Sequence, residues 1–331
     1  MRLSRQAAVL SICVYLICLF GCGLAFPAAE GRFDRTLNVT GPVDLDVTTG
    51  SGSIDIRAGS SSVVQIHGQV RANDDWRSNA QDKVRYLMAN PPIEQNGNII
   101  RIGRIDNETY RNNVSISYEI IVPAETQVRS KTGSGGEKIE GLRGPVDATT
   151  GSGSIAMGNI GGDVIAQTGS GSIALDQVAG RVDAHTGSGS IRAEQISGSI
   201  KAETGSGSVI LGQTSAERGG SRDVDVSTGS GSVEVSGVNG SLRAQCHSGR
   251  IKVDGTPAGD WKLNASSGGI TLQVGTGAAF DLNAHSSSGV IKVDQPVTVT
   301  GALSKHELRG KVRGGGHLID VRTSSGNISI R

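Results

Sequence analysis

The chain has 331 residues, of which 36% are hydrophobic, only 3% are aromatic and 49 are glycine. Its 32 Lys and Arg residues nearly balance its 31 Asp and Glu residues. This near-equality of positive and negative charges argues against nucleic acid as a partner and against attraction to an anionic membrane surface. The glycines recur at fixed positions between apolar residues, which favours ordered turns over disorder.

Residues 1–25 have the features of a secretory signal peptide. Arg2 and Arg5 give it a basic start, and residues 7–20 form an apolar run that is short for a bilayer span. Without these two arginines the charge balance becomes 30 positive against 31 negative residues, which again predicts no electrostatic partner.

Two ways of processing this leader are compatible with the sequence. Residues 19–22 (Leu-Phe-Gly-Cys) resemble a bacterial lipobox, which would leave Cys22 lipidated at the mature N-terminus. Alternatively, an ordinary small-x-small site ending at Ala25 would leave Phe26 as the first residue. An uncleaved membrane anchor is a third interpretation. In the first two cases the protein is exported, and any membrane attachment runs through the lipid on Cys22.

Residues 31–127 are predicted to hold a first coil, near Leu45, followed by a small α+β cap. The cap should contain a strand, a helix that ends before Pro91, a hairpin around Asn96-Gly97, and a strand before Pro123. The expected elements are a strand at Val63–Val70, a helix at Trp76–Asn90 capped by Asp74 or Asp75, hairpin strands at Ile93–Gln95 and Ile99–Ile102, and a strand at Ser115–Val122. We expect this segment to close one end of the repeats that follow it. The helix should bury one apolar face, formed by Trp76, Ala80, Val84, Leu87 and Met88.

Residues 128–331 are built from nonamers of two alternating types, so that the full period is 18 residues. Thr132, Thr150, Thr168, Thr186 and Thr204 mark this period, each opening a Thr-Gly-Ser-Gly turn. In the first nonamer, apolar or threonine residues at positions one, three and five alternate with polar ones, which is typical of a half-buried strand. Position one is Leu45, Val128, Val146, Val164, Val182, Ile200, Val224, Leu242, Trp261, Phe280 and Ile319 in successive copies.

The second nonamer carries apolar residues at positions one, three and six, as in Ile155, Met157 and Ile160. Each period therefore holds two short strands and two turns. A fixed period of this kind predicts coils that stack strand on identical strand in parallel, about 4.8 Å apart. The predicted fold class is all-β: a parallel β-solenoid (β-helix) with two short strands per 18-residue coil, preceded by the small α+β capping segment.

The cysteines and the breaks in the repeat add two further expectations. Cys13, Cys18 and Cys22 lie in the leader, so that Cys246 has no disulfide partner in the body. Cys246 occupies position five, where small side chains such as Thr228 recur, and is predicted to be a buried core thiol. The repeat is interrupted around Ala216–Ser221, near Pro257 and between Val293 and Leu318, and inserts of this kind are common places for function on a solenoid.

The residues that could carry chemistry do not form a recognisable motif. His247 and His285 fall at similar turn positions, which could place them on one ridge, although solvated turn residues are the simpler interpretation. No Lys-Ser/Thr follows the glycine-rich turns, no recurring Asp marks them as calcium-binding, and no Gly-x-Ser-x-Gly elbow occurs. The sequence predicts no catalytic, cofactor-binding or metal-binding residue, and no enzyme.

The order of these segments resembles a known family. Residues 43–56 (Val-Asp-Leu-Asp-Val and then Gly-Ser-Gly-Ser-Ile-Asp-Ile), the charged helix, Tyr118–Pro123 and the tandem Thr-Gly-Ser-Gly-x-Ile coils are similar to the bacterial putative-adhesin family of β-strand-repeat domains. The resemblance covers roughly residues 35–331. It implies an exported β-solenoid of the bacterial envelope and carries over no catalytic residue.

Three functions are compatible with this sequence. We favour a non-enzymatic adhesin or surface-binding module, located in the periplasm, on the outer membrane as a lipoprotein, or at the cell surface. Its expected partner is a cell-surface glycan or an envelope protein. A glycan-cleaving β-helix enzyme, a lyase or hydrolase, would instead require acidic and basic side chains that converge in a groove. An envelope-stress component that binds another protein would show an exposed apolar patch.

Overall fold

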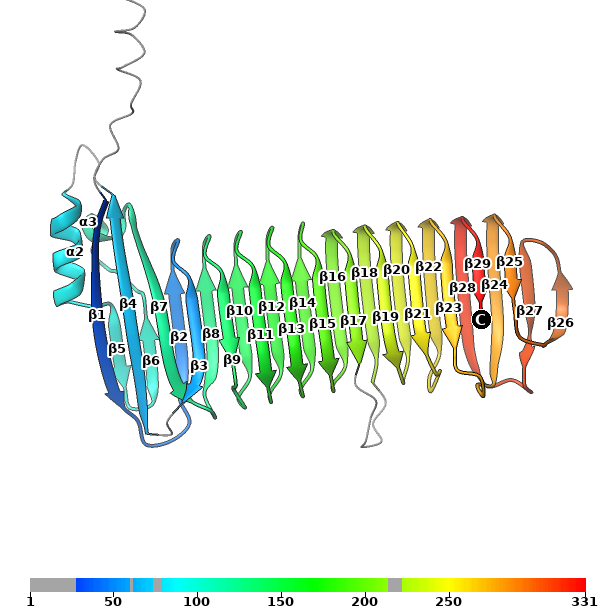
Figure 1. Cartoon of the computed structure of the whole chain (residues 1–331), viewed down its shortest axis with the longest axis horizontal. Coiled ribbons are helices and arrows are strands. Elements are labelled where there is room, and N and C mark those ends of the chain that lie inside the picture. The colour runs from blue at the N-terminus through cyan, green and yellow to red at the C-terminus, as the bar shows by residue number, and fades with distance from the viewer. Residues whose placement is uncertain (1–27, 60–61, 74–78, 214–221) are drawn as a thin grey trace, which may run out of the picture.

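A computed structural model describes residues 28–59, 62–73, 79–213 and 222–331, which form a long rod of stacked strands with a helical cap at one end (Figure 1). These residues form two sheets, of 14 and 15 strands, that face each other across a narrow apolar interior. The predicted all-β parallel solenoid is therefore confirmed. Among these residues, no helix is long and apolar enough to cross a membrane.

Each sheet takes one strand from every coil. Sheet A contains, in spatial order, β1 (Ala28–Asn38), β4 (Val63–Asn73), β7 (Val114–Pro123), β3 (Ile54–Gly59), β9 (Glu137–Glu140), β11 (Ile155–Ile160), β13 (Ile173–Val178), β15 (Ile191–Ile196), β17 (Val209–Gln213), β19 (Val233–Val238), β21 (Ile251–Gly255), β23 (Ile270–Val274), β29 (Ile328–Ile330) and β25 (Ile291–Val293). Sheet B contains β26 (Val297–Leu303), β27 (Glu307–Val312), β24 (Phe280–Ser288), β28 (His317–Ser325), β22 (Trp261–Ser267), β20 (Leu242–Ser248), β18 (Val224–Ser230), β16 (Ile200–Ser206), β14 (Val182–Thr186), β12 (Val164–Thr168), β10 (Val146–Thr150), β8 (Gln127–Thr132), β2 (Asp44–Thr49), β6 (Ile99–Ile102) and β5 (Ile93–Asn96).

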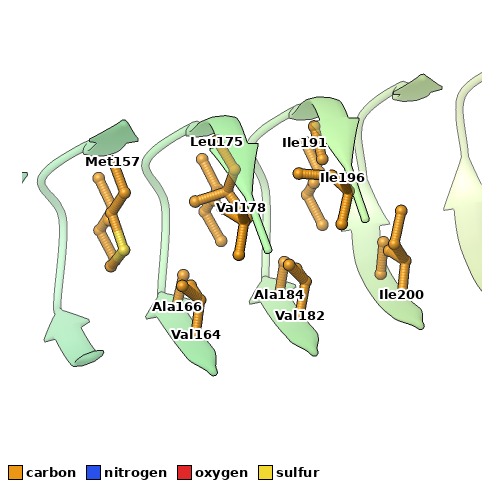
Figure 2. Close-up of a cluster of buried hydrophobic side chains, with 14 of the residues drawn as sticks. Met157, Val164, Ala166, Leu175, Val178, Val182, Ala184, Ile191, Ile196 and Ile200 are labelled. Atoms are coloured by element: carbon orange, nitrogen blue, oxygen red, sulfur yellow. The ribbon is translucent and has the colours of Figure 1, made fainter. Parts of the chain in front are cut away.

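The 18-residue period is the register of the parallel ladders. Val146 pairs with Val164, and Val164 with Val182, so that identical positions stack from coil to coil. These three valines are at most 2% exposed. Val164 and Val182 face second-type residues of the opposite sheet, such as Val178, inside the rod (Figure 2).

The change of spacing in the second nonamer has a backbone cause. Asn159, Gln177 and Gln195 at position five adopt φ values of 55°, 56° and 54°, in the left-handed region. This residue interrupts the alternation of the strand, so that position six turns inward, and Ile160 and Val178 are buried. Asn is among the residues that tolerate this conformation best, and the glycine at 237 takes it in a later coil with a φ of 71°.

The threonines at position five connect one coil to the next. Thr150 Oγ1 donates a hydrogen bond to the Gly135 carbonyl of the preceding coil at 3.0 Å, and it accepts one from Gly153 N–H of its own turn at 3.0 Å. Thr168 and Thr186 repeat both bonds. Each buried hydroxyl thus satisfies one backbone donor and one backbone acceptor that the turn would otherwise leave unpaired.

The glycines of the same turn allow the coils to approach each other. A Cβ placed on Gly153 would lie 1.8 Å from the Gly135 carbonyl oxygen, and a Cβ on Gly171 would lie equally close to the oxygen of Gly153. Any side chain at these positions would therefore push neighbouring coils apart.

Cys246 replaces threonine in this ladder and is buried, as predicted. Its Sγ lies 3.1 Å from the Gly231 carbonyl oxygen, in the place of the threonine hydroxyl, and its side chain is 4% exposed. Burial raises the pKa of the thiol. Ala265 in the next coil has no group to make this bond, so the ladder is interrupted there.

The C-terminal coil lies at an unexpected place in the stack. Strand β28 pairs with β22 on one side and with β24 on the other, so the last coil of the chain is inserted between two earlier ones. In this register Leu282, not Phe280, lies opposite Ile319, and Ser286, not Ala284, occupies the threonine ladder. The prediction that Phe280 and Ile319 follow Trp261 in chain order at position one is therefore wrong, because Ile319 pairs directly with Trp261.

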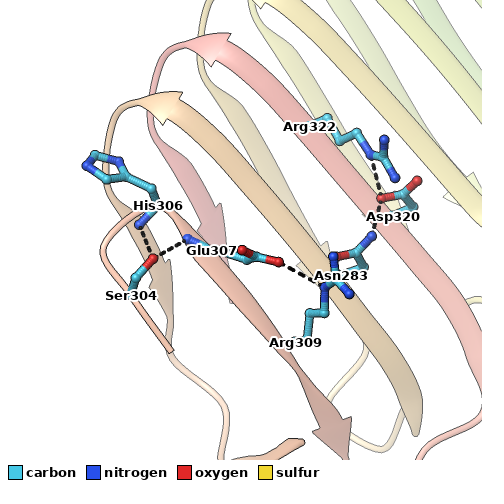
Figure 3. Close-up of polar contacts among 7 residues, drawn as sticks. All are labelled: Asn283, Ser304, His306, Glu307, Arg309, Asp320 and Arg322. Atoms are coloured by element: carbon cyan, nitrogen blue, oxygen red, sulfur yellow. Dashed lines mark hydrogen bonds and ion pairs between the residues drawn. The ribbon is translucent and has the colours of Figure 1, made fainter. Parts of the chain in front are cut away.

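The excursion before this coil is ordered. Strands β26 and β27 pair antiparallel with each other, and β27 pairs antiparallel with β24, which extends sheet B at its far end. Their turn is held by Ser304 Oγ, which accepts bonds from the N–H groups of His306 and Glu307 (Figure 3). The insert at Ala216–Ser221 lies outside the described residues.

The N-terminal cap has the predicted hairpin, β5 with β6, and the predicted strands β4 and β7. The helix is shorter than predicted: α2 covers Ala80–Ala89 and is capped by Asn79, whose side chain accepts a bond from Gln81 N–H at 2.9 Å. Asp74, Asp75 and Trp76 lie outside the described residues. On the predicted apolar face, Met88 is 40% exposed, whereas Ala80, Val84 and Leu87 are buried. A short helix, α3 (Glu108–Arg111), precedes β7.

Strand β1 was not predicted, and it forms the edge of sheet A. It runs antiparallel to β4, which in turn runs antiparallel to β7. Helix α2 packs on β1 because Gly31 has no side chain: a Cβ there would lie 2.4 Å from both Val84 and Met88. The parallel coils thus begin next to a short antiparallel sheet covered by a helix.

We predict that the threonine hydroxyls contribute substantially to stability. Thr150→Val keeps the shape of the side chain but leaves the Gly135 carbonyl and the Gly153 N–H buried without this partner, which should cost about 2 kcal/mol. The control is Thr149→Val on the outer face of the same strand, which should change stability by less than about 0.5 kcal/mol. Urea unfolding of both variants measures the difference, and equal midpoints would contradict the role of the hydroxyl.

Candidate functional site

The outer face of sheet A carries a row of ionisable side chains near the N-terminal end of the rod. Asp34 on β1 lies opposite His67 on β4, which lies opposite Glu119 on β7. Glu119 lies opposite Asp55 on β3, and Asp55 opposite Lys138 on β9. The row therefore crosses five neighbouring strands and lines a groove of about 730 Å³.

The contacts within this groove leave one carboxylate available. His67 Nδ1 contacts the carboxylate of Asp34, and Arg57 pairs with Asp55 at 2.7 Å. The hydrogen bonds that Arg57 donates to Asp55, helped by the negative charge of Asp55, raise the pKa of the Arg57 guanidinium, which stays charged. Within the described ranges, no cation lies within ion-pair distance of Glu119. Its oxygens can accept hydrogen bonds from a ligand, while Lys138 at the end of the row can donate them.

A second, shallower groove of about 330 Å³ continues from the first, and the two share Lys138. Its floor has small side chains, because the row of outward residues continues through Ala156 and Ala174 to Arg192. The ion pairs Lys138–Glu140, at 3.5 Å, and Arg192–Glu194, at 2.5 Å, lie at its two ends. We call the two grooves together the sheet-A furrow; from Asp34 to Arg192 it spans seven strand spacings, or about 34 Å.

A buried carboxyl group lies next to this furrow. Glu137 on β9 occupies a column that is isoleucine in the neighbouring coils, Ile54 and Ile155, and the residue is 2% exposed. Ser130 Oγ donates a hydrogen bond to Glu137 Oε2, whereas Oε1 has no hydrogen-bond partner among the described residues. Burial away from any compensating cation raises the pKa of Glu137 to about 7.

Sequence reasoning did not find these residues. Asp34, His67 and Glu119 come from strands whose antiparallel order is not encoded in the 18-residue period, so no spacing in the sequence brings them together. The sequence holds only a weak signal for such a site, since each of these three is an ionisable residue at an outward position of its own strand.

The structure also tests the residues that the sequence singled out. His247 and His285 do not share a ridge: His285 lies opposite Arg322, in a different row from His247, which contacts Ser266. Cys22, the predicted lipidation site, lies outside the described residues and stays a prediction. In the described ranges, no group of three or more His, Cys, Asp or Glu side chains is arranged to hold a metal ion.

Stacked parallel coils with polar outer rows define a repeat protein of the β-solenoid class. Within that class, the chain belongs to the Toastrack DUF4097 family, whose model matches residues 44–331. The match confirms the family resemblance seen in the sequence.

Two solved structures are similar over nearly the whole chain, each at 11% identity. One is described as a putative cell adhesion protein from Clostridium sporogenes ATCC 15579; 91% of this chain and 99% of that chain are covered, with a TM-score of 0.21. The other is described as a putative adhesin from Bacteroides fragilis NCTC 9343, with 92% and 98% covered and a TM-score of 0.35. No curated protein matches the chain.

We predict that Glu137 makes stability depend on pH near neutrality. Its folded-state pKa of about 7 lies above the ordinary value of 4.5, so its favourable contribution is complete below pH 4.5 and is lost as the pH rises through 7. The loss should approach about 3 kcal/mol at high pH. Thermal unfolding of the wild type and of Glu137→Gln between pH 5 and 9 checks this, since the variant lacks the titrating group. A pH dependence that persists unchanged in Glu137→Gln would show that another group is responsible.

Proposed function

We propose that this protein is a non-catalytic binding module of the bacterial envelope that attaches to a surface glycan through the sheet-A furrow. The observation that carries the proposal is the continuity of the furrow, which runs from Asp34 past Lys138 to Arg192 on an outer face of the rod. A long open furrow suits a linear polymer better than a small molecule, which is usually enclosed.

The lining of the furrow supports a hydroxyl-rich ligand. Its N-terminal half offers an acceptor on Glu119 and donors on Lys138 and His67. Its second half has a floor of alanines, on which the apolar face of a sugar ring could lie. The core beneath is held by ladders of backbone hydrogen bonds, so the furrow is preformed and little ordering is needed for binding.

Export is the second part of the proposal, and it rests on the leader predicted at residues 1–25. An exported module could be attached to a membrane through a lipid on Cys22 or released as a soluble protein that begins at Phe26. Mass spectrometry of the mature N-terminus distinguishes these two forms. Recovery of the chain with Met1 in the cytosol would contradict export.

A glycan-cleaving enzyme is the second candidate function. The observation that favours it is the arrangement of Asp55 and Glu119, two carboxylates opposite each other on adjacent strands, next to His67. Paired carboxylates of this kind are the groups that glycosidases use as acid and as base or nucleophile. A binding assay and a turnover assay on the same polysaccharides separate the two functions.

We expect a glycan and cell-wall array to show saturable binding by the wild type and no product in a turnover assay on the same polysaccharides. The double variant His67→Gln/Glu119→Gln should weaken binding about tenfold, because two polar contacts are lost. The matched control His306→Gln/Glu94→Gln changes exposed residues of the same types outside the furrow and should bind like the wild type.

Each other outcome has a definite meaning. Product that disappears in Glu119→Gln would replace the binding module by an enzyme. Neither binding nor product in these assays would contradict the proposal and favour a protein partner. The first surface to test would then be the exposed Tyr86, whose ring is stacked on that of Tyr110 with the centroids 3.8 Å apart.

A further inference from the structure

The outer face of sheet B carries a second row of charges, along position two of the first-type strands. From β14 onward the row contains Asp183, Lys201, Asp225, Arg243 and Lys262, each directly opposite the next in the parallel ladder. The signs alternate from strand to strand until Arg243 and Lys262, where two cations are neighbours. Like charges on adjacent strands repel each other and destabilise the pairing.

One of the two carboxylates that flank these cations in the row is already engaged. Asp320, which follows Lys262 in the row, accepts hydrogen bonds from Arg322 at 3.0 Å and from Asn283 at 2.9 Å, and its side chain is 13% exposed (Figure 3). Asp225, on the other side, lies opposite both Lys201 and Arg243, and the pKa of Lys201 is raised first by Glu203 and further by Asp183 and Asp225. Within the described ranges, neither Arg243 nor Lys262 lies within ion-pair distance of a carboxylate.

Carboxylates at the rim of the strands are engaged in the same way. Asp260 accepts a bond from Leu318 N–H at 2.9 Å and lies 3.9 Å from His317 Nδ1. Asp223 accepts a bond from Ser241 N–H at 3.3 Å. The charges of Arg243 and Lys262 are therefore not neutralised by an ion pair with any of these carboxylates.

Arg243 and Lys262 line a groove of about 600 Å³ that crosses five strands of sheet B, from β14 to β22. Arg181 and Lys201 line its other end. Four carboxylates line the groove as well, those of Asp183, Asp223, Asp225 and Asp260. The groove is open, so an extended chain could lie across the strands with one of its groups between the two cations. The spacing of the two residues is one strand, about 4.8 Å, which allows both to contact a single anionic group.

We propose that Arg243 and Lys262 form a binding site for the anionic groups of an acidic polysaccharide. The inference rests on the proposed function in that the ligand is a glycan, and it adds a site on the opposite sheet and the charge of the ligand. The paired cations explain why like charges are tolerated here: a carboxylate, phosphate or sulfate between them removes the repulsion. A flat membrane surface fits less well, because Arg243 and Lys262 line a groove that a single extended chain can enter.

The test measures binding of fluorescein-labelled chains to the full-length exported protein at low and moderate salt. The probes are polygalacturonate for carboxylate, dextran sulfate for sulfate, polyglycerol phosphate for phosphate, and neutral dextran. At least one anionic probe should bind, and the double variant Arg243→Gln/Lys262→Gln should weaken that binding about tenfold at low salt and make it less dependent on salt. The comparison among anionic probes shows which group the site prefers.

Two further variants serve as controls. Arg250→Gln/Lys131→Gln removes the same net charge from exposed positions outside the groove and should leave binding within about twofold of the wild type. Arg243→Lys/Lys262→Arg keeps both charges and should retain most of the affinity. Far-ultraviolet circular dichroism and the thermal midpoint verify that every variant is folded.

The proposal is overturned if no anionic probe binds, or if Arg243→Gln/Lys262→Gln binds like the wild type. It is also overturned if this variant and the control Arg250→Gln/Lys131→Gln lose affinity equally. If neutral glycans bind through the sheet-A furrow and Arg243→Gln/Lys262→Gln has no effect on any probe, this inference is contradicted and the proposed function is not. If anionic probes bind at this site and the furrow variant His67→Gln/Glu119→Gln binds every glycan like the wild type, the inference stands and the proposed role of the furrow is contradicted.

Discussion

The structure depends on the close approach of successive coils at the Thr-Gly-Ser-Gly turn. There the backbone of one coil comes so near to that of the next that a Cβ on Gly153 would lie 1.8 Å from the oxygen of Gly135. In most coils a threonine hydroxyl pairs the groups left over by the turn, and Thr150 bonds one coil to the next while closing its own turn. The rest of the coil follows from this corner: its position sets the register of both sheets, and a narrow core of valines, isoleucines and alanines fills the space between them. With so few large side chains, backbone ladders and these hydroxyls contribute much of the stability.

The same arrangement separates stability from function. Inward positions and corners are restricted to a few residue types, whereas position two can be Asp147, Ile165 or Lys201 without consequence for the core. Parallel stacking then places every outward residue directly opposite its equivalent in the next coil. Outward side chains therefore form continuous rows along the rod, and their residue types can vary. The cation pair of sheet B and the part of the sheet-A furrow from Lys138 to Arg192 are two such rows, on opposite faces of one scaffold.

Sequence reasoning succeeded where structure is local and periodic. The inward direction of Val146 and Val182 and the burial of Cys246 follow from spacing alone. It failed where strands pair out of chain order, because nothing in a strand's own pattern identifies its neighbour. The insertion of β28 next to β24 moved Phe280 and Ala284 by two positions, and the antiparallel order of β1, β4 and β7 assembled the furrow residues. The hydroxyl bonds were also missed: a small residue was expected at position five, but the reason for threonine is visible only when the carbonyl of the previous coil is in place.

The most direct test of this account compares two alanine substitutions within one coil. Gly153 and Gly158 lie in the same repeat, but a Cβ on Gly158 would meet nothing within 4 Å. If the close approach at the corner controls the fold, urea unfolding should show that Gly153→Ala loses about 3 kcal/mol or more. Gly158→Ala should stay within about 0.5 kcal/mol of the wild type or gain stability, because alanine loses less backbone entropy. Similar unfolding midpoints for the two variants would contradict the account.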